Sequence, residues 1–377
     1  MSPSLVPADL LRKSDKILFI AHLALGDFTY LQSCLRAFSE AFPHIAIHLW
    51  VDELRRTSRK SEWEALRKYS LYDWLAECPF IAKVYNRTYS PALYRESIRE
   101  ARRQKYPIVV SFGLLRRQRY ARLARRISPD GFVAGQVKRV RFLDIPTYLA
   151  YRKLDARIPS YSVSAQDPQH ISDIYAGWFK LLFGMEVAPA ARFPFVDIPE
   201  SWKRHAEDRF AAWGFTKSDR VVFLNSFSKG AQRNWPLQRI IELIRAMRAH
   251  EAWRDTAFLV NVVPEELDQA RKLFAGCALP RVHLFSAVDN FFELPAILRL
   301  CNLVISVETA IMHLANAVHV PVIALMRQRN PEWTPIDREN SIIISVPGAE
   351  DWVDKITVDD VMKVLGEVDE QRLAAAR

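Results

Sequence analysis

The feature that most constrains the fold is an alternation of short apolar runs with longer amphipathic stretches. Each run contains four to seven residues, mainly Val, Ile, Leu and Phe, as is typical of strands buried on both faces. The ten predicted strands are residues 16–21, 44–50, 81–84, 108–111, 221–225, 256–262, 282–285, 303–306, 320–325 and 341–345. Because the stretches between them are of helical type, we predict an α/β protein with doubly wound parallel sheets.

A proline-rich segment divides this pattern into two series of strands. It follows a predicted helix at residues 170–183 and contains Pro189, Pro194 and Pro199. The predicted organisation is an N-terminal domain (1–186), a linker (187–200), a C-terminal domain (201–350) and a C-terminal helix within 351–377 that packs back on the N-terminal domain.

The most informative single segment is residues 302–325, which has the pattern of strand, turn, helix and strand. Thr309 can cap the helix, whose free N–H groups then make an anion site at the end of the strand. Glu308, Thr309 and His313 surround that point. The alternative is an ordinary crossover helix in which His313 is merely packed.

A second candidate lies after the first strand, where a loop at residues 21–27 precedes an amphipathic stretch at 28–42. We expect this loop to end in Gly26 and Asp27. Gly26 allows a tight turn or a close ligand approach. Asp27 is either a helix N-cap or a carboxylate that acts as a general base.

A third candidate is the polar loop at residues 226–234, between a strand and a helix that opens at Trp235 and Pro236. Its serines and cations suit a diphosphate; they are Ser226, Ser228, Lys229 and Arg233. Taken by itself, the loop also fits a solvated basic turn.

In order and spacing, the three motifs together resemble glycosyltransferase family 9, the ADP-heptose:lipopolysaccharide heptosyltransferases. The residues that carry the resemblance are Leu25-Gly26-Asp27, Asn225 to Ser228, Arg233, Trp235-Pro236, Ser306, Glu308, Thr309, Ala310, His313 and Leu314. Weaker similarity at residues 106–117 and 331–335 extends the resemblance over about residues 15 to 365.

This resemblance implies a GT-B-like fold, with two Rossmann-like domains facing across a cleft. It implies an inverting transfer of a sugar, heptose first among the candidates, from an ADP-sugar to an acidic lipopolysaccharide-core or related glycan acceptor. Asp27 would be the catalytic base. The donor would contact Ser226, Ser228, Lys229, Arg233, Glu266, Glu308, Thr309, Ala310 and His313, with Glu265 as an alternative to Glu266 and the loop 286–290 near the adenine. Gly26, Arg116 and Arg117 would contact the acceptor, and no cofactor or metal is expected.

Two departures from the family pattern fall in the donor motif, where Glu308 replaces Asp and Ala310 replaces Gly. Ser111 replaces an Asp in the weaker N-terminal element. These departures keep two alternatives open: a family 9 relative with a different nucleotide sugar, and a non-catalytic binding protein on the same fold. A nicotinamide-dependent enzyme is disfavoured because no Gly-x-Gly-x-x-Gly follows the first strand.

The whole chain has a net charge of +10, and the excess positive charge is concentrated in its first half. Residues 1–185 hold 30 Lys and Arg against 17 Asp and Glu, which predicts an anionic partner. The alternative is a basic surface that is only solvated. Nucleic acid is disfavoured, since no nucleic-acid motif is present. The expected partners are the nucleotide-sugar donor, an anionic glycolipid acceptor and the inner-membrane surface. Predicted helices at 95–105 and 114–126 have basic faces, and the second has an apolar side from which it could lie on anionic headgroups (Leu114, Leu115, Tyr120 and Leu123).

The expected location is the cytoplasm, with peripheral contact at the inner face of the bacterial inner membrane. No apolar run approaches the roughly 20 residues of a membrane span, and the N-terminus has no secretory pattern. The four cysteines show no metal-like or disulfide spacing.

Overall fold

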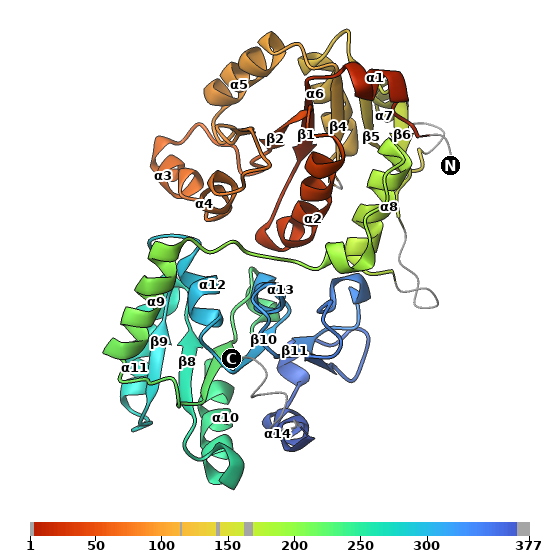
Figure 1. Cartoon of the computed structure of the whole chain (residues 1–377). Coiled ribbons are helices and arrows are strands. Elements are labelled where there is room, and N and C mark those ends of the chain that lie inside the picture. The colour runs from red at the N-terminus through yellow and green to blue at the C-terminus, as the bar shows by residue number, and fades with distance from the viewer. Residues whose placement is uncertain (1–3, 114, 141–143, 162–168, 368–377) are drawn as a thin grey trace. The chain divides into compact units, whose positions relative to one another are not determined.

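The computed structural model describes residues 4–113, 115–140, 144–161 and 169–367. Over these residues the chain forms two parallel six-stranded sheets with flanking helices (Figure 1). The first unit comprises Met1–Ser164 and Ile171–Arg192, and the second comprises Ala165–His170 and Phe193–Arg377. The division after Arg192 lies inside the proline-rich segment. The short piece around His170 belongs to the second unit, where His170 Nε2 lies 2.9 Å from the carbonyl oxygen of Thr334.

The first unit contains a sheet in the order β3-β2-β1-β4-β5-β6. Its strands are β1 (Lys16–Ala21), β2 (Ala46–Val51), β3 (Lys83–Tyr85), β4 (Ile108–Ser111), β5 (Phe132–Gln136) and β6 (Ala156–Ile158). Its helices are α1 (Ala8–Lys13), α2 (Leu25–Ala41), α3 (Trp63–Arg67), α4 (Leu71–Ala76), α5 (Pro91–Arg103), α6 (Arg117–Ile127), α7 (Ile145–Tyr151) and α8 (Ile171–Phe183).

Strand β1 shows why this sheet is covered on both faces. Successive side chains of a strand point to opposite faces. Leu18 and Ile20 therefore join the core beneath α5 and α6, which includes Tyr120. Phe19 points the other way, where its ring centroid lies 5.7 Å from that of Phe38 on α2 and 5.8 Å from that of Phe179 on α8. Because both faces are apolar, the strand is an uninterrupted hydrophobic run.

The second unit contains a sheet in the order β12-β11-β10-β7-β8-β9. Its strands are β7 (Val221–Asn225), β8 (Ala257–Asn261), β9 (Val282–Phe285), β10 (Leu303–Val307), β11 (Val322–Met326) and β12 (Ser341–Ser345). Its helices are α9 (Glu200–Ala212), α10 (Leu237–Ala249), α11 (Leu267–Ala275), α12 (Glu293–Leu298), α13 (Ala310–Ala317) and α14 (Val358–Glu367).

The last described helix, α14, packs on α10 of the second unit. Its Val361 and Leu365 are buried in the same core as Ile240 and Leu243 of α10. The indole N–H of Trp235 donates a 2.9 Å hydrogen bond to the carbonyl oxygen of Ile356, which ties the start of α10 to the chain just before α14. The described part of the predicted C-terminal helix therefore belongs to the core of the second unit.

Both sheets share one strand order, in which the first and fourth strands of the unit lie side by side. β1 pairs with β2 and β4, and β7 pairs with β8 and β10. In each unit the first three strands are added toward one edge of the sheet. The fourth strand then pairs with the other side of the first strand, and the last two continue toward the opposite edge. In open α/β sheets, ligands bind at this reversal point, beyond the carboxyl ends of the strands. The topology therefore marks one candidate site in each unit.

The predicted doubly wound α/β class is confirmed, and five strands have the predicted bounds (β1, β4, β7, β9 and β12). Strands β5 and β6 and helix α7 were not predicted. One local prediction was wrong: Gly26 and Asp27 do not end a loop but lie in the first turn of α2, which begins at Leu25.

Candidate functional site

The reversal point of the second unit holds a polar cluster centred on Asn225, the last residue of β7. The Asn225 side-chain amide donates to Ser306 Oγ on β10 (2.9 Å) and to Thr309 Oγ1 (3.2 Å). Its carbonyl oxygen accepts a 2.8 Å hydrogen bond from the side chain of Asn261, the last residue of β8. These bonds lock together the carboxyl ends of three neighbouring strands.

Thr309 caps α13, as the sequence predicts, because its hydroxyl accepts the backbone N–H of Ile311 (3.2 Å). The positive end of the helix dipole thus lies beside the Asn225 cluster. Ala310 is the first residue of α13 and has a negative φ, so the backbone does not need a glycine there. The difference from the family pattern is limited to the added Cβ atom.

The loop at residues 226–234 is closed by its own hydrogen bonds. The backbone N–H of Trp235 donates to the carbonyl oxygen of Ser226 (2.9 Å), and that of Ser228 donates to Asn234 Oδ1 (2.7 Å). Among the described residues, the buried Ser226 hydroxyl has no hydrogen-bond partner. Arg233 is partly buried in a short 3₁₀ helix (Ala231–Arg233), and Lys229 is exposed. The loop therefore offers a buried hydroxyl and two cations beside the end of β7.

Glu308, which stands where the family has Asp, is bound within the second unit. Its carboxylate accepts hydrogen bonds from Arg327 (3.2 and 3.3 Å) and from the Asn330 side chain (3.0 Å). Both side chains of the ion pair are almost fully buried, at 5% and 9% exposure. The Arg327 guanidinium also lies 5.0 Å from the ring centroid of Trp352. The negative charge of Glu308 is therefore balanced by Arg327 within the second unit.

His313 is buried on α13 at 3% exposure, with its ring centroid 6.1 Å from that of Trp333. Burial, with a smaller effect from the charge of nearby His170, lowers the pKa of His313 to about 3. His313 is therefore a neutral imidazole at pH 7, able to donate one hydrogen bond and accept another.

The ends of β8 and β9 extend the same edge of the sheet. Glu265 is exposed and Glu266 is partly buried, in a 3₁₀ helix just beyond β8. The loop at residues 286–290 is held by the buried Glu293, which accepts the backbone N–H groups of Asp289 (2.7 Å) and Asn290 (3.1 Å). Arg209 pairs with the other carboxylate oxygen of Glu293 at 3.0 Å.

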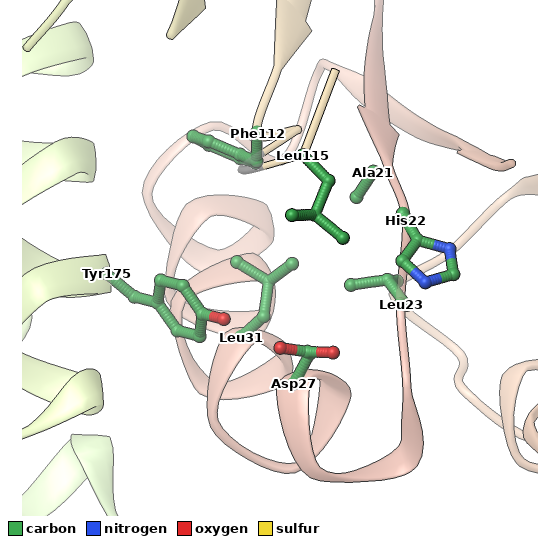
Figure 2. Close-up of a pocket in the computed structure, with 8 residues that line it drawn as sticks. All are labelled: Ala21, His22, Leu23, Asp27, Leu31, Phe112, Leu115 and Tyr175. Atoms are coloured by element: carbon green, nitrogen blue, oxygen red, sulfur yellow. The ribbon is translucent and has the colours of Figure 1, made fainter. Parts of the chain in front are cut away.

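The reversal point of the first unit carries a pocket of about 120 Å³ (Figure 2). It lies where the chain leaves β1 and β4. The residues that line it are Ala21, His22, Leu23, Asp27, Leu31, Phe112, Leu115 and Tyr175. Most of these side chains are apolar, so Asp27 and Tyr175 are placed in a mainly hydrophobic wall.

Asp27 is held by the helix that carries it. One of its carboxylate oxygens accepts the backbone N–H of Ala24 at 2.8 Å, which satisfies one N–H at the helix start. Figure 2 shows the carboxylate of Asp27 and the hydroxyl of Tyr175, on α8, turned toward one another. Burial raises the pKa of Tyr175 well above its usual value, and the charge of Asp27 adds to the effect. Tyr175 is therefore a neutral hydroxyl, able to donate a hydrogen bond toward Asp27.

The remaining predicted residues of the first unit are close in sequence to residues that line this pocket. Gly26 precedes Asp27 in the first turn of α2. Arg116 is exposed, has a positive φ of 56° and precedes α6, which begins at Arg117. Ser111 is the buried last residue of β4. Both arginines thus follow the strand that forms one side of the reversal point.

Several residues in these sites were not assigned to a site in the sequence analysis, although Asn225 was named there as part of a family motif. They are Tyr175, Asn225, Asn261, Glu293, Arg327 and Asn330. Asn225 and Asn261 end buried strands, and Arg327 directly follows one. A polar residue at the end of an apolar strand is the sequence signal that could have found these three.

Two further properties concern the described residues. No helix among them is both long and apolar enough to cross a bilayer. They also include no group of three His, Cys, Asp or Glu side chains arranged to hold a metal ion.

Comparison with known proteins places this geometry in a family. The model of glycosyltransferase family 9 (heptosyltransferase) matches residues 151–356. A search of curated proteins finds no significant match. Among solved structures, the glycosyl transferase family 9 protein from Veillonella parvula DSM 2008 is 18% identical, with a TM-score of 0.71 over 100% of this chain and 99% of that one.

Two Escherichia coli enzymes share the fold as well. ADP-heptose lps heptosyltransferase II is 14% identical, with a TM-score of 0.64 over 96% of this chain and 99% of that one. Heptosyltransferase WaaC with ADP-2-deoxy-2-fluoro heptose is 16% identical, with a TM-score of 0.60 over 93% and 99%. The two-sheet architecture is thus the GT-B-like fold of these heptosyltransferases, and since the family model covers more than half of the sequence, the chain belongs to glycosyltransferase family 9.

Proposed function

We propose that this protein is an inverting glycosyltransferase that moves a sugar, heptose first among the candidates, from an ADP-sugar to an acidic lipopolysaccharide-core or related glycan acceptor in the cytoplasm. The observation that carries the proposal is the Asn225 cluster, which sits at the reversal point of the second sheet beside the capped start of α13. Ligands of open α/β sheets bind at such points, and helix starts favour phosphates.

In this proposal the second unit binds the nucleotide diphosphate. Its phosphates lie against the loop 226–234 and the start of α13 at Thr309 and Ala310. Arg233 and Lys229 supply positive charge, and the Ser226 hydroxyl gains the partner that it lacks. A heptosyltransferase of the same fold has been solved with ADP. Negative charge builds on the diphosphate as the sugar leaves, so these groups stabilise the transition state more than the bound substrate.

In this proposal a residue of the first unit accepts the proton of the attacking hydroxyl. An acceptor hydroxyl attacks the anomeric carbon, the new C–O bond forms, and the bond from that carbon to the diphosphate oxygen breaks. Asp27 takes the proton of the attacking hydroxyl, and the nucleoside diphosphate leaves with the electron pair of the broken bond. A single displacement inverts the configuration at the anomeric carbon. A pocket of about 120 Å³ holds a few water molecules, so it admits only the part of the acceptor that bears the reacting hydroxyl.

Neither a cofactor nor a divalent metal has a part in this proposal, because charge on the leaving group is met by Arg233, Lys229 and backbone N–H groups. Full activity in EDTA is the expected result. A rate that EDTA abolishes and added magnesium restores would contradict it.

A family 9 relative that uses another nucleotide sugar remains the second candidate. It is favoured by Glu308, whose longer side chain is bound to Arg327 and Asn330. The same contacts argue against a non-catalytic binding protein. That alternative rested on repulsion between Glu308 and a diphosphate, whereas Arg327 balances the charge.

The deciding experiment is calorimetric titration of the full chain with ADP, UDP, GDP and CDP. We expect selective binding of ADP that is lost in Arg233→Ala. Selective binding of another nucleotide would keep the glycosyltransferase and change the donor. Binding of none of the four would contradict the proposal, provided that the circular dichroism and unfolding midpoint of the sample show a folded chain.

A further inference from the structure

Helix α7 exposes an apolar face that no sequence motif indicated. Five large hydrophobic side chains are exposed among the described residues, and three of them lie on this one helix. They are Ile145 at 61% exposure, Tyr148 at 52% and Leu149 at 51%. Their spacing of three and four residues places them on one side of the helix. The opposite side, with Thr147, Ala150 and Tyr151, is buried.

The face of α7 is bordered by positive charge. From α6, Arg122 donates a 2.9 Å hydrogen bond to the carbonyl oxygen of Pro146, in the first turn of α7. Arg152 and Lys153 follow α7 directly and are exposed. Lys138 is also exposed, and its backbone N–H donates to the Tyr151 hydroxyl at 3.2 Å. Exposed positive side chains, which we call the rim, therefore lie near both ends of the helix that carries the face.

Little negative charge offsets this rim. Residues 116–157 contain 12 Lys and Arg but only 3 Asp and Glu. Asp144 accepts the backbone N–H of Thr147 as the cap of α7, and Asp155 is paired with Arg125 at 2.6 Å. A compact apolar face inside a cationic rim is complementary to a lipid bilayer with anionic headgroups, because the apolar side chains enter the headgroup boundary while the cations meet the phosphates.

We propose that Ile145, Tyr148 and Leu149, with the rim of Arg122, Lys138, Arg152 and Lys153, form a docking surface for an anionic lipid bilayer. This α7 surface replaces the one suggested by the sequence. Of the four residues in that earlier prediction, Tyr120 and Leu123 are buried in the core, so they are not available to a membrane. Leu115 is exposed at 59% but lines the pocket beside Asp27, and Leu114 lies outside the described residues. Helix α7 packs against α6.

The inference goes beyond the proposed function, since it concerns where the protein resides and not what it transfers. Vesicle binding can therefore fail while nucleotide binding persists, and the two results are independent. Calorimetric binding of ADP, or thermal unfolding where no nucleotide binds, verifies that each variant is folded.

The test is flotation of the full chain with vesicles of phosphatidylcholine alone and of phosphatidylcholine mixed with phosphatidylglycerol. We expect binding only to the mixed vesicles, and weaker binding as the salt concentration rises. The triple variant Ile145→Ser, Tyr148→Ser, Leu149→Ser should bind at least tenfold more weakly. The double variant Arg152→Gln, Lys153→Gln should lose several-fold in affinity and part of the salt dependence.

Matched controls come from the second unit. Val288 is as exposed as Ile145, at 61%, so Val288→Ser removes the same kind of side chain away from α7. Because Val288 lies in the loop 286–290, thermal unfolding and not ADP binding verifies the fold of this control. Arg204→Gln with Lys217→Gln removes two exposed cations there. Both controls should bind vesicles like the unchanged chain.

Three outcomes would overturn the proposal. The first is no binding of the unchanged chain to the mixed vesicles at low salt. The second is equal loss of binding in the α7 variants and the controls. The third is a dimer in sedimentation that the triple variant dissociates, without vesicle binding, which would assign the surface to a second copy of the chain.

Discussion

Glu308 and Arg327 form a buried ion pair across the ends of two neighbouring strands. Glu308 follows β10 and Arg327 follows β11, and the parallel register that sets Val307 opposite Leu325 brings them together. Each charged group of the pair also has a second partner, because Asn330 donates a hydrogen bond to the Glu308 carboxylate and the Trp352 ring lies against the Arg327 guanidinium. The pair therefore fixes the position of Glu308, one of the residues by which this chain departs from the family pattern.

Removal of one partner should be far more costly than removal of both. Arg327→Met leaves a buried, uncompensated carboxylate, and we expect it to lower the free energy of unfolding by about 3–5 kcal/mol. The double variant Glu308→Gln, Arg327→Met should recover most of that loss. Urea unfolding of the single and double variants measures both values. Equal destabilisation in both would show that packing of Arg327 on Trp352, not charge, is what matters.

The proposed role of Asp27 as base predicts a loss of rate without a loss of donor binding. Asp27→Asn should reduce sugar transfer by roughly 10²–10⁴-fold while ADP affinity is unchanged. Stability should change by less than about 1 kcal/mol, since the Asn oxygen can still accept the Ala24 N–H. Asp9, an exposed acid in the first turn of α1, provides the control Asp9→Asn. Normal transfer by Asp27→Asn would remove this residue from the mechanism.

The Asn225 cluster predicts an effect on nucleotide binding that depends on which end of the sheet is changed. Asn225→Asp replaces the amide donor to Ser306 and Thr309 by a negative charge, so we expect ADP affinity to fall at least tenfold. Asn302 lies at the opposite end of β10, where its side-chain oxygen accepts the backbone N–H of Val221 at 2.8 Å. Asn302→Asp keeps that acceptor and should leave ADP affinity unchanged. Similar losses in the two variants would show a general effect of buried charge.

The buried His313 predicts a loss of stability in mild acid. Its pKa of about 3 in the folded chain lies below the unfolded value of about 6.5, so the folded state resists protonation. Its contribution to stability is complete above pH 6.5 and is lost as the pH falls toward 3. By pH 5 the loss from this one residue should reach about 2 kcal/mol.

Urea unfolding at pH 7 and pH 5 measures this dependence. In His313→Gln the difference between the two pH values should shrink, whereas in the exposed control His250→Gln it should not. An unchanged difference in His313→Gln would assign the acid sensitivity to other groups.

The sequence predicted the strands that are buried on both faces and missed elements that are short or partly exposed. Strands such as β1 and β7 are buried on both faces, so the apolar run itself gives their bounds. β6 has only three residues, with an exposed Arg157 in the middle, and β5 is interrupted by Gly135. Neither has enough apolar sequence to stand out. Helix α7 was missed because it is short and apolar on both sides.

The candidate sites were predictable where a single segment carries the chemistry. Thr309 caps its own helix, and its role as a cap follows from local sequence alone. The partners of Glu308 and Asn225 come from other strands, so they depend on the order of strands in the sheet, which the chain does not state locally. Asp27 is a third case. An Asp is typical of a helix start, so the sequence predicted its position near the start of the helix, but it did not predict that Asp27 lies inside the first turn and not at the N-cap.

The shared strand order also bears on how the sites come into being as the chain folds. Each reversal point joins the first and fourth strands of its unit, so neither site exists until a strand from late in the unit has inserted beside the first one. Such non-local pairing is a slow event in folding. Under the proposed function, a nucleotide that binds beside Asn225 would recognise only folded second units, and by mass action it would draw partly folded chains toward the folded state.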